Sequence, residues 1–449
     1  MRSLRIAFIT AAAVAILSGA AIAQSHYTFS PIANLNDYAG YFEPATITNP
    51  GDVLFAPAML TGGEGVLLWH HGTITTIAKG GQPTLDNGLC WPLTTPSDCP
   101  FFGYTFSPVQ MNDSGDVAFV MSRDGINNIP SPLGINAGVY RYNRRTGMVP
   151  VLLPGMPAPG GGRFWGSFYF VSINNDGDIY VPGLVCTTAT VSYPTQACPE
   201  GPGVLAQGVY KASPRGRITS VVQPGDAAPG GSYFDFTNDP AANERGDVAF
   251  AGHIFSDTCV NPFLLGCWNS AFLKDGRSGR IVPLARIGDR SPVNGKTYTA
   301  GIIPMLNSEG DVAFVADFSP ANDFSDDAAL FYSHGRTIKV AEVGDTMPDG
   351  KTLAKVGPYG QDIAMNNAGD VIFDATLTDG TQALYLWRHG RLSLVARTGT
   401  QTPAGAISDL DDYGCGFACT QLWINEAGRI LFMAHFQDGG GALLVATPR

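Results

Sequence analysis

One short motif recurs seven times along this chain, and it limits the possible folds more than any other feature. The motif is Asn-x-x-Gly followed by an apolar run, as in "NDSGDVAFV" from Asn112. A variant copy, "TNPGDVLFA", starts at Thr48 and has its glycine at Gly51. The other copies pair Asn112 with Gly115, Asn174 with Gly177, Asn243 with Gly246, Asn307 with Gly310, Asn366 with Gly369, and Asn425 with Gly428. Successive glycines are 59 to 69 residues apart, a period typical of solenoids, propellers and arrays.

Each repeat predicts four β-strands. The 55 Gly and 32 Pro residues separate short runs rich in Val, Ile, Phe and Tyr, and helical periodicity is scarce. In the fourth repeat we expect strands A to D to begin at Tyr233, Gly246, Ser270 and Gly279. The motif lies between strands A and B, where Asn tolerates a left-handed backbone and Gly supplies a positive φ. We therefore interpret it as a tight hairpin turn.

Strand B is apolar on both faces, because Val117, Ala118, Phe119 and Val120 follow one another without alternation. Such a strand must be covered on both sides, as in sheets arranged radially around an axis. The last repeat ends after strand C, and "HYTFSPIANL" from His26 looks like an orphan strand D. We predict an all-β, seven-bladed β-propeller of four-stranded antiparallel blades, closed by the N-terminal strand joining the last blade.

The first residues predict export. Arg2 and Arg5 precede an apolar run from Ile6 that ends in the small residues Ala21 and Ala23, a pattern typical of a secretory signal peptide. An uncleaved membrane anchor is the alternative, but the run is at the short limit for about 30 Å of hydrocarbon. We expect a signal peptide at residues 1–23, then a single propeller domain at residues 24–449, secreted or periplasmic, with no membrane span after cleavage.

The eight cysteines fall into four close pairs, as expected for short disulfides in an oxidising compartment. The pairs are Cys90 with Cys99, Cys186 with Cys198, Cys259 with Cys267, and Cys415 with Cys419. Metal or redox chemistry is the alternative, but the spacing of the last pair differs from Cys-x-x-Cys.

Three repeats extend the motif to Asn-x-x-Gly-x-x-Ala-Phe, in the copies that start at Asn112, Asn243 and Asn307. In this the whole mature chain resembles the exported bacterial family described as choice-of-anchor, tandem-repeat NxxGxxAF-containing proteins. The resemblance implies a propeller-like repeat array and no settled activity. This sequence departs from the family pattern because it ends without a recognisable C-terminal surface anchor.

The charge makes nucleic acid a poor partner. The chain has 27 Lys and Arg against 38 Asp and Glu, and losing Arg2 and Arg5 with the leader would leave a net charge of −13. Such a protein repels phosphate backbones and anionic lipid heads. We expect a monomer whose partner is a glycan or an envelope or extracellular protein.

The long connections, B to C and D to A, are expected on one face of the ring together with all four cysteine pairs. Rigid loops on a scaffold commonly carry binding groups, and flat aromatic rings stack on sugars. The alternative is that these rings cap the core. The candidate ligand-binding residues are Trp91, Trp165, Phe263, Trp268, Phe417, Asp409, Asp411 and Asp412.

Clustered loop carboxylates allow two further chemistries, calcium binding and acid–base cleavage of a glycoside. Asp226, Asp289 and Asp345 recur at one repeat position, which favours turn capping instead. Nucleophile, Walker and dinucleotide motifs are absent, so no catalytic residue is assigned and no cofactor is expected, calcium being the exception. We expect an exported binding module; the alternative is a propeller-fold polysaccharide hydrolase or lyase using loop carboxylates.

Overall fold

The computed structural model describes most of the chain from His26 onwards. The described residues are 26–38, 42–57, 65–79, 101–105, 109–124, 137–166, 170–188, 197–198, 202–255, 270–319, 325–357, 363–410 and 422–449. In these ranges the chain is β apart from one short 3-10 turn, η1 (Leu35–Asp37). None of these residues forms a helix with the length and hydropathy needed to cross a bilayer.

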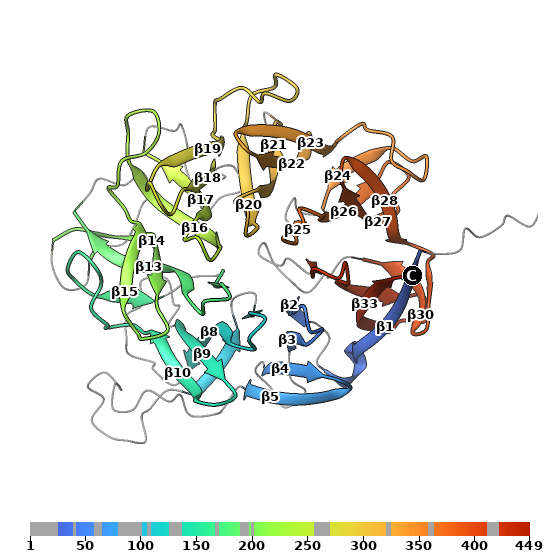
Figure 1. Cartoon of the computed structure of the whole chain (residues 1–449), viewed down its shortest axis with the longest axis horizontal. Helices are drawn as coiled ribbons and strands as arrows, with labels where there is room; N and C mark the ends of the chain where they lie inside the picture. The colour runs from blue at the N-terminus through green and yellow to red at the C-terminus, as the bar shows by residue number, and fades with distance from the viewer. Residues whose placement is uncertain are drawn as a thin grey trace, which may run out of the picture.

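Seven antiparallel sheets stand side by side in a ring, with β2, β16 and β20 near the axis and β5, β15 and β19 towards the rim (Figure 1). We number these blades 1 to 7 and keep the letters A to D for strand positions, A being innermost. Blade 1 contains β2 (Phe42–Ile47), β3 (Val53–Pro57), β4 (Gly65–His70) and β5 (Thr73–Lys79). Blade 2 contains β6 (Phe101–Thr105), β7 (Gln110–Met111), β8 (Val117–Asp124), β9 (Ala137–Asn143) and β10 (Gly147–Leu152). Blade 3 contains β11 (Phe164–Gly166), β12 (Ser172–Ile173), β13 (Ile179–Thr187), β14 (Val204–Ala212) and β15 (Ile218–Val222).

The remaining blades follow the same order. Blade 4 contains β16 (Phe234–Ala242), β17 (Val248–Ile254), β18 (Ser270–Lys274) and β19 (Ile281–Ala285). Blade 5 contains β20 (Ala300–Leu306), β21 (Val312–Asp317), β22 (Asp327–Ser333) and β23 (Arg336–Glu342). Blade 6 contains β24 (Leu353–Val356), β25 (Ile363–Met365), β26 (Val371–Leu377), β27 (Gln382–Arg388) and β28 (Arg391–Arg397). Blade 7 contains β29 (Gln401–Thr402), β30 (Gly405–Asp409), β31 (Trp423–Ile424), β32 (Ile430–Phe436), β33 (Gly441–Pro448) and β1 (Tyr27–Asn34).

The apolar B strands bury both of their faces, as predicted. In β8, Val117 and Phe119 pack in one hydrophobic cluster with Leu54 of blade 1. Their neighbours Ala118 and Val120 pack in another cluster with residues of blade 3, such as Val181. Alternate residues of one strand therefore contact opposite neighbouring blades, which is why the strand is apolar at every position.

The ring is closed by its two chain ends, which confirms the prediction. β1 pairs antiparallel with β33 from Tyr27 opposite Pro448 to Asn34 opposite Ala442, and the two strands lie together in the ring (Figure 1). Phe29 of β1 packs edge-on against Phe432, with ring centroids 6.1 Å apart. The N-terminal strand thus covers the outer edge that β33 would otherwise expose.

In every blade, the innermost strand A is either interrupted or bulged. In blades 2, 3, 6 and 7, two short segments share strand position A. In blades 1, 4 and 5 a continuous strand shifts register, as between Asn238 and Ala241 in β16.

The C-to-D turns agree with the sequence. His71 and Gly72, between β4 and β5, both have positive φ (47° and 84°), and His334–Gly335 and His389–Gly390 repeat this pattern. Two consecutive positive φ values define the type I′ turn of two-residue hairpins. The predicted signal peptide lies outside the described residues.

Ring closure can be tested with Phe29→Ala, which removes a ring that is only 7% exposed. We expect a loss of about 3 to 5 kcal/mol of unfolding free energy, as for other buried aromatic truncations. Urea unfolding followed by tryptophan fluorescence measures it. Ser30→Ala, at an exposed position of the same strand, should change stability by less than about 0.5 kcal/mol. Equal effects of the two changes would contradict the packing role of β1.

Candidate functional site

The recurring motif forms a turn whose asparagine acts through its side chain. Asn112 Oδ1 accepts hydrogen bonds from the backbone N–H groups of Ser114 (3.1 Å) and Asp116 (2.9 Å). The Gly115 N–H donates to the Asn112 carbonyl, and Gly115 has a φ of 80°. The expected positive φ of the glycine is confirmed. The expected left-handed asparagine is wrong, because none of the motif asparagines has a positive φ.

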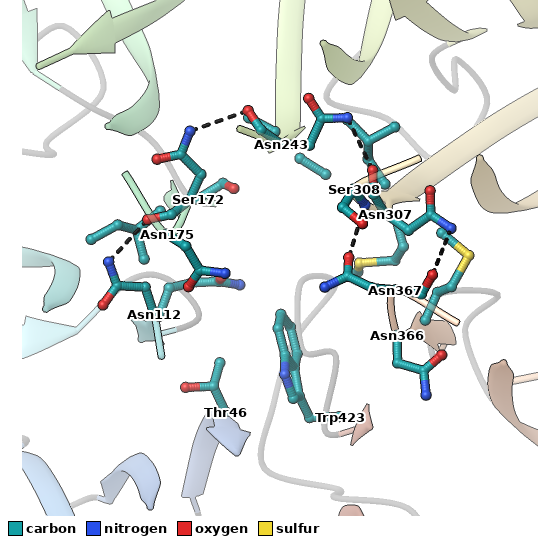
Figure 2. A pocket seen from close by; sticks show the side chains of 18 of the residues that line it. Thr46, Asn112, Ser172, Asn175, Asn243, Asn307, Ser308, Asn366, Asn367 and Trp423 are labelled. Atoms are coloured by element: carbon teal, nitrogen blue, oxygen red, sulfur yellow. Dashed lines mark hydrogen bonds between the residues drawn. The ribbon is translucent and has the colours of Figure 1, made fainter. Parts of the chain in front are cut away.

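The same asparagines connect neighbouring blades through the other end of the amide. Each Nδ2 donates to a backbone carbonyl of the next motif in the ring, as around the cavity in Figure 2. The links run from Asn112 to Asn174 (3.0 Å), Asn174 to Asn243 (3.1 Å), Asn243 to Asn307 (3.0 Å), Asn307 to Asn367 (3.4 Å), Asn366 to Asn425 (3.1 Å) and Asn425 to Thr48 (2.9 Å). These asparagines are at most 4% exposed. One buried amide therefore caps its own turn and bonds to the adjacent sheet.

A second set of bonds involves the residue after each asparagine. Its backbone N–H donates to the side-chain oxygen of the corresponding residue in the next blade. The links run from Asn49 to Asp113 (2.9 Å), Asp113 to Asn175 (3.0 Å), Asn175 to Glu244 (3.0 Å), Ser308 to Asn367 (2.8 Å), Asn367 to Glu426 (2.8 Å) and Glu426 to Asn49 (2.8 Å). Asn, Asp or Glu at this position supplies an acceptor long enough to span the gap between sheets.

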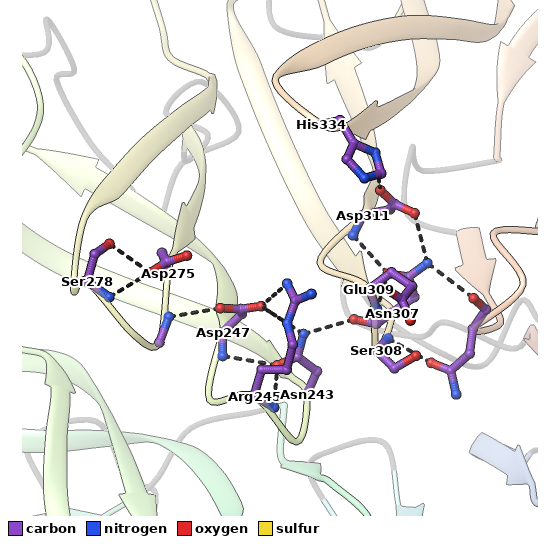
Figure 3. Close-up of polar contacts among 12 residues, drawn as sticks. Asn243, Arg245, Asp247, Asp275, Ser278, Asn307, Ser308, Glu309, Asp311 and His334 are labelled. Carbon is purple, nitrogen blue, oxygen red and sulfur yellow. Dashed lines mark hydrogen bonds and ion pairs between the residues drawn. The ribbon is translucent and has the colours of Figure 1, made fainter.

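Two of the seven blade junctions have only one of these links among the described residues. Thr48 has no amide, so blade 1 bonds to blade 2 through Asn49 alone, whose Nδ2 also donates to Asp113 (2.8 Å). Between blades 4 and 5, Ser308 follows Asn307 and is too short to bond to Glu244. The amide link from Asn243 joins those blades (Figure 3). Every junction keeps at least one bond.

The aspartate four residues after the motif asparagine ties the turn to strand C. Asp178 pairs with Lys211 at 2.6 Å, and Asp370 accepts two bonds from Arg388, at 2.9 and 2.6 Å. The hydrogen bond to Asp370 raises the pKa of Arg388. In Figure 3, Asp247 instead accepts from Arg245 and from the backbone of the β18–β19 turn. These bonds connect the motif turns to strand C, or to the turn after it, in the same blade.

A cavity of about 180 Å³ lies on the axis and is lined by all seven blades. Its walls are the motif turns and the inner strands, and the half-buried Trp423 of β31 projects towards its middle (Figure 2). The charged residues of the lining are Asp113, Asp239, Glu244 and Glu426, and no Lys, Arg or His is among the described lining residues. The cavity is therefore anionic.

Asp239 is an unusual member of this lining. It lies in the bulge of β16 with a φ of 49°, and Ile303 of β20 has a φ of 45° at the corresponding position. Positive φ is rare for residues other than glycine and costs backbone energy. Although Asp239 is only partly buried as a residue, its Oδ1 is fully buried without a hydrogen-bond partner. Burial raises the pKa of Asp239 to about 7.

Few of the sequence-predicted ligand-binding residues fall in the described part of the chain. Trp165 of β11 and Asp409, the last residue of β30, are both half-buried. Trp91, Phe263, Trp268, Phe417, Asp411 and Asp412 lie outside the described residues. These residues remain a prediction, and the sequence reasoning did not single out Asp239 or Trp423.

The described residues include one of the predicted cysteine pairs and the recurring aspartates. Cys186 and Cys198 form a disulfide, with Cα atoms 5.7 Å apart, that confirms one predicted pair. Cys90, Cys99, Cys259, Cys267, Cys415 and Cys419 lie outside the described residues. The recurring aspartates cap turns, since Asp226 and Asp345 accept from the backbone of Gln223 and Glu342 at 3.0 and 2.9 Å. Within the described ranges, no three His, Cys, Asp or Glu side chains are grouped for a metal ion.

Comparison with known proteins supports the fold. The sequence profile of a family of unknown function (DUF7453) matches residues 265–444, which include blades 5 and 6. None of the curated proteins matches the chain. A puromycin-hydrolyzing peptidase of Mycobacterium tuberculosis has a similar structure, with 14% identity, a TM-score of 0.51, and coverage of 93% of this chain and 54% of the peptidase.

Two other solved structures resemble this chain less closely. A structure titled as an analysis of two prolyl endopeptidases has 11% identity, a TM-score of 0.45, and coverage of 95% of this chain and 51% of that chain. An Aleuria aurantia lectin in complex with Fucalpha1-6GlcNAc has 11% identity, a TM-score of 0.35, and coverage of 82% and 99%. This chain thus spans about half the length of the two peptidase chains. At these identities the comparisons show the fold alone.

The double role of the asparagine can be tested with Asn366→Ala. Its side chain accepts from the Asp370 N–H and donates to the Asn425 carbonyl and to Asp370 Oδ2. At roughly 1 kcal/mol per bond, we expect a loss of about 3 kcal/mol in urea unfolding. Asn367→Ala is the matched control, because it removes one exposed acceptor and should cost less than about 1 kcal/mol. Equal losses would refute the special role of the motif position.

The incomplete junction between blades 1 and 2 allows the opposite test. Thr48→Asn should supply the missing amide donor to the next motif and raise the unfolding free energy by about 1 kcal/mol. The Thr48 hydroxyl accepts from the Asp52 N–H at 3.1 Å, and an asparagine Oδ1 can replace it. Thr48→Ser keeps the hydroxyl without the amide and serves as the control. A Thr48→Asn protein no more stable than the serine variant would count against the inter-blade bond.

Proposed function

We propose that the protein is an exported binding module that recognises a glycan or an envelope or extracellular protein. We place the contact on the loop face, the side of the ring that carries the B-to-C and D-to-A connections. The observation that carries this proposal is the difference between the two faces. The motif turns are alike in every blade, and their polar groups are used in bonds between blades. On the loop face the connection between β13 and β14 spans 188–203, whereas that between β26 and β27 spans 378–381.

Variable loops on a rigid scaffold are where proteins commonly carry binding residues. The Cys186–Cys198 disulfide holds the longer of these two connections. Trp165 is close to this connection, because its neighbour Phe164 pairs with Val185 in β13, the strand that leads into it. A fixed aromatic ring loses little entropy when it stacks on a sugar or an apolar side chain. We assign the same role to Trp91, Phe263, Trp268, Phe417, Asp409, Asp411 and Asp412.

Export fits the position of the closing strand. Cleavage after Ala23 would leave β1, which begins at Tyr27, intact in the ring. A disulfide is typical of an oxidising compartment outside the cytoplasm. We therefore propose a secreted or periplasmic monomer. We also propose that the chain belongs to the NxxGxxAF repeat proteins, since three of the turns that join its blades carry that full motif, in the copies from Asn112, Asn243 and Asn307.

The test is a glycan array and a set of purified envelope glycans probed with the mature protein and with Trp165→Ala. We expect at least one glycan to be retained, and retention to fall about tenfold or more in Trp165→Ala, since loss of a stacked ring costs about 1 to 3 kcal/mol. Trp165→Phe should keep most of the binding. Trp69→Ala, at the end of β4 that adjoins the β4–β5 turn, is the control and should bind like the native protein.

Two outcomes would reject this proposal. Retention that is the same in Trp165→Ala and the native protein would exclude a role for this ring. Turnover of a polysaccharide that disappears when Asp411 and Asp412 are replaced together by Asn would instead support the alternative, a hydrolase or lyase using loop carboxylates.

A further inference from the structure

The axial cavity has a chemical character that the loop-face proposal does not use. Three of its four carboxylates are already engaged in the bonds between blades. Asp113 accepts two bonds from Asn49, Glu244 accepts from Asn175, and Glu426 accepts from Asn367. Asp239 is different, because it takes no part in these links and its Oδ1 has no hydrogen-bond partner.

Asp239 differs from the residues at the same position of the two neighbouring blades. The corresponding bulge of blade 5 holds Ile303, and the interrupted inner strand of blade 3 holds Phe170, also with a positive φ of 30°. Apolar residues therefore serve this position in the neighbouring blades. The Asp239 Oδ1 is buried without a hydrogen-bond partner although the residue is only partly buried, and such groups are found where a ligand or a reaction requires them. Ile and Phe meet the structural needs of this position in the neighbouring blades, so the fold itself does not require a carboxylate at position 239.

The rest of the wall suits an organic cation. Trp423 projects into the cavity, and Phe170, Met305 and Met365 line it as well. Cations are attracted to the faces of aromatic rings, tryptophan most strongly. The surrounding carboxylates repel anions, and no basic side chain of the described lining offsets them.

A divalent metal ion fits less well. Calcium takes six to eight oxygen ligands, and the other three carboxylates of the lining are engaged with blade junctions. In the part of the chain that the structure describes, no cluster of three metal-binding side chains exists. The small volume, about 180 Å³, also excludes a polymer.

We propose that the axial cavity binds a small organic ammonium ion, with Asp239 as its counter-ion and the Trp423 ring packed against the cation. This site is separate from the loop face and does not depend on the function proposed for it. Either site can therefore fail its test without affecting the other.

Isothermal titration calorimetry and tryptophan fluorescence of the mature protein test this site with four probes: methylammonium, tetramethylammonium, choline and putrescine. We expect saturable binding of at least one probe at pH 8, and an affinity about tenfold or more lower in Asp239→Asn. Trp423→Leu should also weaken binding and should remove the fluorescence response. Asp438→Asn, on the exposed β32–β33 turn, removes one negative charge elsewhere and should bind like the native protein.

The pH dependence gives a second readout. Because the pKa of Asp239 is raised to about 7, the carboxylate forms as pH rises from 6 to 8, and cation affinity should rise with it. The other titratable groups of the described lining are Asp113, Glu244 and Glu426. Asp239→Asn should lose this pH dependence.

The same pKa argues that Asp239→Asn will fold. The raised pKa means that protonation favours the folded state, so the stability due to this group is full below about pH 4 and is lost as pH rises through 7. Asparagine stays neutral and tolerates a left-handed backbone. The variant should therefore be at least as stable as the native protein at pH 8, and thermal unfolding checks this.

Three results would overturn the proposal. The first is no saturable binding of any of the four probes. The second is binding that is unchanged in Asp239→Asn. The third is displacement of the bound probe by millimolar Ca²⁺ in the native protein but not in Asp239→Asn, which would assign the cavity to a metal ion.

Discussion

The hydrogen bond from each motif asparagine to the next blade is the interaction on which the ring depends. A propeller blade can pack its apolar faces against its neighbours at several rotations, because the hydrophobic effect has no direction. A buried amide is directional, and leaving it unpaired costs about 1 to 3 kcal/mol. The Nδ2 of Asn243 therefore fixes the position of blade 5 against blade 4 at one point near the axis. Six of the seven junctions use such an amide and the seventh uses Asn49, which explains why the chain repeats its motif.

In the motif asparagine, both ends of the side-chain amide form hydrogen bonds. The Oδ1 of Asn307 caps its own turn through Glu309 and Asp311, while Nδ2 bonds to the next blade. Glycine three residues later supplies the positive φ that lets the turn close, 86° at Gly310. A change of the asparagine therefore weakens the turn and the junction together. The local turn and the global ring are thus specified by the same residues.

Much of the architecture could be predicted from the sequence because it is encoded locally. The period, the strands apolar on both faces and the orphan strand near the N-terminus were enough to predict seven blades and their closure. The junction bonds could not be predicted, because Asn243 and Asn307 are 64 residues apart and only the folded ring brings them together. The bulge at Asp239 was also missed. Its only local signal is the following Pro240, which disfavours a helical backbone without indicating where the side chain lies.

Symmetry separates the structural residues of this ring from those free to serve another purpose. Positions that every blade uses, such as the motif asparagine, are explained by the junctions. The position two residues before the motif holds six different residue types: it is Thr46, Gln110, Ser172, Ala241, Met305, Ala364 and Trp423 in turn. Six of these side chains are smaller than tryptophan, so the blades pack around the axial cavity without requiring an aromatic ring at this position. Trp423 and Asp239 line the same cavity, one aromatic and one anionic. Among the described residues, neither side chain takes part in the bonds between blades, and their shared place in the lining supports the proposed ligand that contacts both.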